Sequence, residues 1–209
     1  MVNTRHVERA VTTASRTATE ARGRAIIDLA IRQELVGLSD LIQSFVSDAG
    51  IENKLKIKVL LVLALNPNQQ VRYCVLPTAS EPSKTTRNLV NLLDSDGRNL
   101  SQNQFGLKAI HVLALYAKAF NYSEVLEIAN QLYSKILKSM LARANQPLAD
   151  EMQTLSASSF VTMMLGSRDD NEFFQFVEGY YGREPLIERY EQEELGGRAP
   201  VVLETAENN

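Results

Sequence analysis

Apolar residues recur at helical spacing over most of the chain. They lie three or four positions apart in segments 24–35 and 41–46, where Gly37 and Gly50 mark the expected ends. The spacing is clearest over 123–141, which predicts a long central packing helix. Further helices are expected over 83–93, 102–120, 147–166 and, with Asp170 as the N-cap, 171–181.

One region has two interpretations. Residues 54–59 alternate lysine with an apolar side chain, and Val71–Leu76 has the composition of a strand. A turn at Pro67 would join them into a small β-hairpin near 55–76. The uninterrupted apolar run Val59–Leu65 instead favours a buried helix for the first segment. We expect the helix and keep the hairpin as the alternative.

The fold class that follows is all-α, a mainly helical single domain. A chain of 209 residues with 44% hydrophobic positions is long enough to bury one core. We expect that core within residues 25–184, because both flanking segments are poor in large apolar residues. The flanks, residues 1–24 and 185–209, are predicted to be flexible arms.

The net charge of −3 conceals a gradient along the chain. Residues 1–24 hold five arginines against two glutamates, and residues 184–209 hold seven glutamates against two arginines. Opposite charges on the two flanks suit head-to-tail association, or a basic arm bound to an anion. The alternative is that both flanks are simply solvated.

The composition offers little for catalysis. There are two histidines, one cysteine and no glycine-rich phosphate loop, and a single cysteine excludes the common thiolate zinc sites. His111 lies in an apolar helical run and Cys74 beside apolar neighbours, so both are expected to be structural. We therefore predict no catalytic residue, no metal and no cofactor.

No apolar run approaches the roughly 20 residues that a membrane-spanning helix needs. The chain also shows no secretory signal. We accordingly expect no membrane partner and a soluble, intracellular protein, cytoplasmic or carried in a virion if it is a coat protein.

Two sets of residues remain as candidate sites. The basic side chains that a fold can bring together on a nucleic-acid backbone are Arg16, Arg22, Arg24, Lys54, Lys56, Lys58, Arg72 and Arg87. The aromatic side chains that cannot all face one core, and so suit a subunit or partner interface, are Phe173, Phe174, Tyr180 and Tyr181.

These features predict a non-enzymatic, self-assembling structural protein of the coat or nucleocapsid kind. Its expected partners are other copies of itself and single-stranded nucleic acid. A helical adaptor that binds another protein through the aromatic helix is the alternative.

Overall fold

The computed structural model describes residues 4–76, 89–90, 92–93, 105–144 and 171–197. Within these ranges the chain forms helices and no strand, which confirms the all-α prediction. The helices are α1 (Thr4–Ile31), α2 (Leu38–Ser47), α3 (Asn53–Ala64), α4 (Gln69–Tyr73), α7 (Phe105–Ala119), α8 (Ser123–Ala144), α11 (Glu172–Tyr181) and α12 (Glu184–Gly197). The predicted helices over 83–93 and 147–166 lie largely or wholly outside the described residues.

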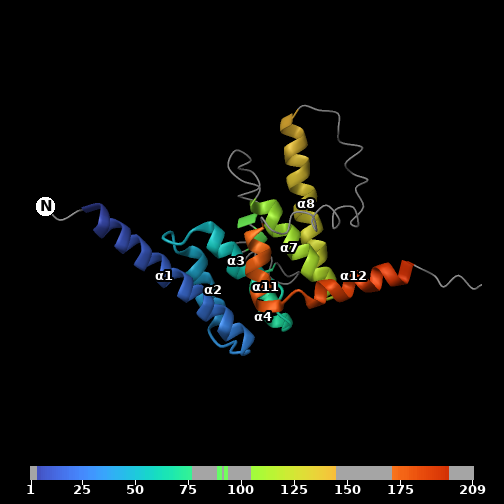
Figure 1. Cartoon of the computed structure of the whole chain (residues 1–209), viewed down its shortest axis with the longest axis horizontal. Helices are drawn as coiled ribbons and strands as arrows, with labels where there is room; N and C mark the ends of the chain where they lie inside the picture. The colour runs from blue at the N-terminus through green and yellow to red at the C-terminus, as the bar shows by residue number, and fades with distance from the viewer. Residues whose placement is uncertain (1–3, 77–88, 91, 94–104, 145–170, 198–209) are drawn as a thin grey trace, which may run out of the picture.

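Helix α3 is the centre of the body and is contacted by α1, α4, α7 and α11 (Figure 1). Its residues from Val59 to Ala64 are all buried, so no face of this part of the helix meets solvent. A helix that is apolar all round is stable only inside a core. Helices α7 and α8 pack closely on each other, and α12 contacts α7.

The β-hairpin alternative for residues 55–76 is wrong. The first segment forms α3, because burial of the run Val59–Leu65 outweighs the two-residue alternation that precedes it. The second segment forms the short helix α4, and the Asn68 side chain caps it by accepting a hydrogen bond from the Gln70 amide. The turn around Pro67 was predicted correctly, but it joins two helices.

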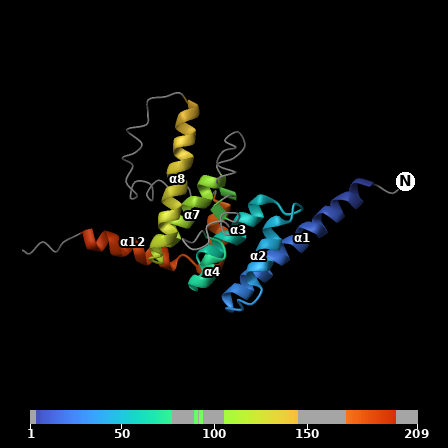
Figure 2. The same ribbon diagram turned by 180° about the vertical axis from the view of Figure 1, so that it is seen from behind.

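Both predicted arms contain helix. Helix α1 runs without a break across the expected boundary at residue 24, and Gly23 within it lies against Phe45 and Val59. Helix α12 occupies the first part of the segment 185–209. Figures 1 and 2 show the N-terminal half of α1 and the C-terminal half of α12 extending from the body in opposite directions along the long axis. Their role as arms stays a prediction.

Candidate assembly and nucleic-acid interfaces

Arg72 is a structural residue of the core. Its guanidinium donates hydrogen bonds to Glu124 on α8, at 2.6 and 3.0 Å, and to the carbonyls of Asn66 and Pro67 at 2.9 and 3.1 Å. It also lies over the ring of Tyr122, 4.1 Å from the centroid. The residue is only 6% exposed, so it ties α4 to α8 and offers no charge to a nucleic acid.

The three lysines of α3 do not form one patch. Lys54 and Lys58 are one turn apart and both pair with Glu172 of α11, at 2.6 and 3.2 Å. Lys56 lies on another side of the helix and is buried. Partial burial of Glu172 acts to raise its pKa, but the hydrogen bonds and charges of the two lysines prevail and lower it. In a helix, the alternating lysines therefore fall into two groups. Lys54 and Lys58 tie α3 to α11 through Glu172, and Lys56 is buried.

The arginines of α1 differ from one another. Arg16 pairs with Glu20, one turn along the same helix at 3.2 Å. Arg22 reaches α2, where it donates to Asp48 at 2.9 Å and to Ser44 at 2.8 Å. Arg24 is exposed. Arg87 lies outside the described residues.

A groove of about 470 Å³ runs between α1 and the start of α3. It brings together three of the predicted basic residues, Arg16, Lys54 and Lys58, with Glu20 and Glu52. Because Glu172 also pairs with both lysines, cations and carboxylates balance there. The groove is polar and charge-neutral, which gives little attraction for a phosphate backbone.

The aromatic helix α11 is sandwiched between α3 and α7. Phe173 and Phe174 are 0% and 2% exposed, and Phe174 packs against Tyr116 with ring centroids 6.0 Å apart. The Tyr181 hydroxyl donates to the carbonyl of Val62 at 2.5 Å. Phe173 and Phe174 are thus core residues and present no surface to a partner, because a helix covered from two sides buries more than one face. Tyr180 and Tyr181 are partly buried.

His111 and Cys74 are poorly suited to acid–base or nucleophilic chemistry. Burial lowers the pKa of His111 to about 4, and its ring lies 6.1 Å from that of Tyr133. Burial raises the pKa of the Cys74 thiol, which donates to the Gln70 carbonyl at 3.3 Å. Among the residues that the structure describes, no three His, Cys, Asp or Glu side chains lie close enough together to hold a metal ion.

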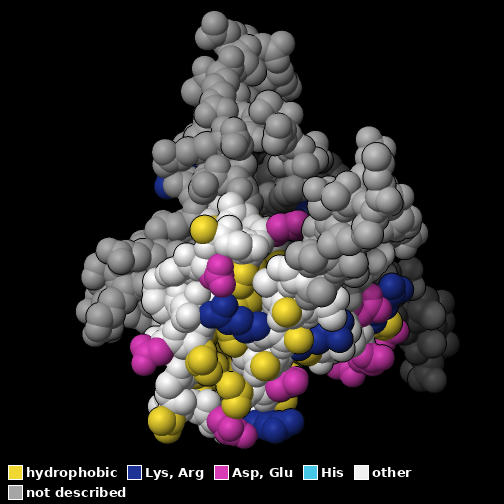
Figure 3. All heavy atoms as spheres, turned by 90° about the vertical axis from the view of Figure 1, so that its left-hand side faces the viewer, with side chains coloured by type: hydrophobic (Ala, Val, Ile, Leu, Met, Phe, Trp, Pro, Cys, Tyr) yellow, Lys and Arg dark blue, Asp and Glu magenta, His cyan; other side chains and the backbone are white. Residues whose placement is uncertain are grey.

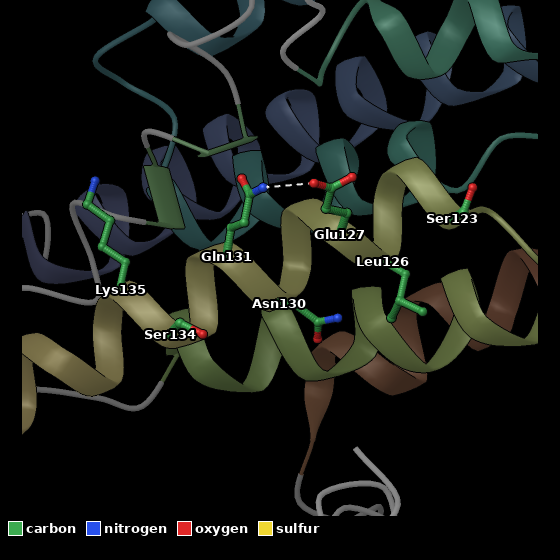
Figure 4. Close-up of a pocket in the computed structure, with 7 residues that line it drawn as sticks. All are labelled: Ser123, Leu126, Glu127, Asn130, Gln131, Ser134 and Lys135. Atoms are coloured by element: carbon green, nitrogen blue, oxygen red, sulfur yellow. Dashed lines mark hydrogen bonds between the residues drawn. The ribbon is translucent and has the colours of Figure 1, made fainter. Parts of the chain in front are cut away.

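A second, shallower groove of about 710 Å³ follows the outer side of α8 (Figure 4). Its described lining residues all belong to this one helix: Ser123, Leu126, Glu127, Asn130, Gln131, Ser134 and Lys135. Gln131 donates to Glu127 at 3.1 Å. Most of these residues are uncharged and polar by type, and no pair among them is arranged for proton transfer.

Sequence reasoning missed an exposed apolar corner, formed by Ile31, Val36 and Leu41 where α1 turns into α2. Their exposed fractions are 50%, 101% and 43%. Figure 3 shows hydrophobic side chains gathered on the lower part of this side of the molecule. The apolar spacing of the two helices had suggested that Ile31 and Leu41 face the core, but both are exposed, and Val36 lies in the turn between the helices. Grouped exposed apolar residues are typical of protein contacts.

No protein-family model, curated protein or solved structure matches this chain. In the part of the chain that is described, no helix combines the length and the hydropathy needed to cross a bilayer.

Proposed function

We propose that this chain is a non-enzymatic structural protein that assembles with copies of itself, in the manner of a coat or nucleocapsid subunit. The observation that carries the proposal is the uncovered surface of α1. Residues 15–18 are exposed at four successive positions, more than one full turn, so among the described residues no helix covers this part of α1, and α3 only borders it across the groove at Ser15 and Arg16.

A helix without packing neighbours is only weakly stabilised by its own sequence. Isolated helices are marginal in water, and most helical stability in proteins comes from packing. Two polar ties of this segment are local to α1: the Arg16–Glu20 pair and the Thr19 hydroxyl, which donates to the Arg16 carbonyl at 2.8 Å. A neighbouring subunit would supply the missing packing. The apolar corner at Ile31, Val36 and Leu41 supports the same reading, since a contact there would remove apolar surface from water.

Binding of single-stranded nucleic acid is the finer part of the proposal and rests on fewer residues than expected. Of the described candidates, Arg16 and Arg24 are exposed, although Arg16 pairs with Glu20. The others are paired with carboxylates (Arg22, Lys54 and Lys58) or buried (Arg72 and Lys56). Two cations per subunit are enough only if many subunits line up along one strand, because the contacts then repeat. Nucleic-acid binding is thus expected to depend on assembly.

The alternative, a helical adaptor for another protein, draws on the same exposed corner. Its predicted aromatic surface is weakened by the burial of Phe173 and Phe174. An adaptor would use the corner without assembling.

Light scattering after size-exclusion chromatography tests the proposal. Measured over a range of loading concentrations, the mass of the full chain is expected to exceed the 23.3 kDa of one copy and to grow with concentration. The ratio of absorbance at 260 and 280 nm, before and after nuclease, reports bound nucleic acid. A mass of 23.3 kDa at every concentration, with or without added single-stranded RNA, would contradict the assembly proposal.

A further inference from the structure

Helices α1 and α12 present complementary outer faces, and we infer that α12 of one copy docks on α1 of the next. The inference rests on the proposed self-assembly and names its contact. Helix α1 carries five arginines against three acidic residues, a net charge of +2. Helix α12 carries five glutamates against one arginine, a net charge of −4.

The outer face of α1 is a narrow strip of small side chains. The inner side of the helix buries Ile26, Ile27 and Ala30, while Ala18, Ala21 and Ala25 are exposed at three- and four-residue spacing on the opposite side. Alanines at this spacing leave a shallow strip on which another helix can approach closely. Exposed Arg24 and Arg32 border the strip, with Asp28 as an acidic residue among them.

The outer face of α12 has the matching form. Ile187 is 48% exposed on this helix, although it is large and apolar. Glu184, Glu188 and Glu191 lie one, three or four positions from it and are also exposed, so carboxylates surround one apolar side chain. Leu186 packs toward the body, where α12 contacts α7. The Ile187 face is therefore directed away from the described part of its own chain.

The positions of the two helices favour contact between copies. Helix α1 begins toward one end of the long axis and α12 ends toward the other (Figures 1 and 2), so the two helices of one copy lie apart and each is open to a neighbouring copy. Ile187 would pack on the alanine strip, and the glutamates would face Arg24 and Arg32. Such a contact joins two different surfaces, so repeating it gives a ring or an open filament. The charges select the partner and orient it, and the apolar anchor supplies most of the affinity.

Charge reversal tests the inference in the full chain. R24E/R32E and E188K/E191K are each expected to weaken self-association by about tenfold or more, as measured by sedimentation velocity. E52K/E127K reverses two exposed glutamates away from both faces and serves as the matched control, with a change below about threefold. Exposed charges are screened by salt, so association of the unmodified chain should also weaken from about 50 to 500 mM NaCl.

Combining the two sets of substitutions gives the decisive test. A copy with R24E/R32E has two acidic faces, and a copy with E188K/E191K has two basic faces, so a mixture should associate although neither variant does so alone. One chain with all four substitutions should regain self-association to within about threefold of the original.

The outcomes separate this inference from the proposed function. If the unmodified chain assembles and both reversals behave like E52K/E127K, assembly uses another surface and the α1–α12 contact is wrong. If the reversals weaken assembly but neither the mixture nor the fourfold variant restores it, these faces do not meet each other. If the unmodified chain is a monomer throughout, the proposed function itself fails.

Discussion

Arg72 and Arg24 carry the same charge in opposite surroundings. Arg72 is buried between α4 and α8, where Glu124, two carbonyls and the Tyr122 ring occupy its guanidinium. Arg24 lies exposed on α1, on a flank whose charge reaches the Tyr180 hydroxyl of α11. The body thus uses its cations to hold helices together, whereas the outer side of α1 leaves them available. A count of basic residues cannot distinguish these uses.

The largest effect is expected from R72M. It removes every hydrogen bond of the guanidinium and leaves two carbonyls without that donor, at a cost of about 3 kcal/mol in the free energy of unfolding. Because Glu124 is partly exposed, water can solvate its freed charge, which limits the loss. Urea denaturation measures it. The matched control R16M breaks an exposed pair and should change stability by less than about 0.5 kcal/mol. Equal losses of stability in R72M and R16M would contradict the contrast between buried and exposed arginines.

Mild acid should destabilise the body through His111. Its pKa is about 4 in the folded protein, below the ordinary value of 6.5, so the unfolded chain takes up the proton first. The free energy of unfolding is highest above pH 6.5 and falls as the pH drops toward 4. The loss reaches about 2 kcal/mol at pH 5. Urea midpoints at pH 7 and pH 5 test this, with H111Q as the variant in which the difference shrinks. An unchanged difference in H111Q would assign the acid sensitivity to another group.

Two glycines sharpen the contrast between covered and open helix surface. A Cβ at Gly23 would lie 2.9 Å from the buried Val59 side chain, whereas one at Gly179 on α11 meets nothing within 4 Å. G179A should stabilise by up to about 1 kcal/mol through helix propensity. G23A has the same propensity gain but must displace core atoms, so it should fall about 1–2 kcal/mol below G179A. Thermal unfolding of both variants measures the difference, and equal stabilities would show that α1 sits loosely on the body.

The smallest effect is expected at Tyr181. Y181F removes the hydrogen bond to the Val62 carbonyl and should cost about 1 kcal/mol. Burial raises the pKa of Tyr181 above its ordinary value of 10, so the unfolded chain loses this proton first as the pH rises. Stability should therefore fall above pH 10, and less steeply in Y181F. A parallel loss in both proteins would show that Tyr181 does not govern the alkaline limit.

Local patterns predicted most of the fold. The apolar spacing over 123–141 and the run Val59–Leu65 led to α8 and to the buried part of α3, because burial of a continuous face dominates local preference. The cap of α11 was displaced by one residue: Asn171, not Asp170, accepts hydrogen bonds from the Phe173 and Phe174 amides. Adjacent polar residues compete for this role, and spacing alone does not separate them.

The candidate sites were much less predictable. The partner of Arg72 lies 52 residues away in sequence, and that of Lys58 lies 114 away. No local pattern reveals such pairs, so internal cations resembled candidates for nucleic-acid binding. The helix α12 was missed for a related reason, since its largely polar sequence shows little of the stripe that identifies a packed helix. The charge gradient, by contrast, was visible in the sequence and gains a structural meaning from the opposite positions of α1 and α12.

The most direct test of the central claim, that fold and assembly use different charges, combines two observables on R24E/R32E. Its free energy of unfolding in urea, measured at the lowest workable protein concentration, should match that of the unmodified chain to within about 0.5 kcal/mol. Its sedimentation mass, at the highest concentration, should fall toward 23.3 kDa while the unmodified chain stays larger. A lowered midpoint, or an unchanged mass, would contradict the claim.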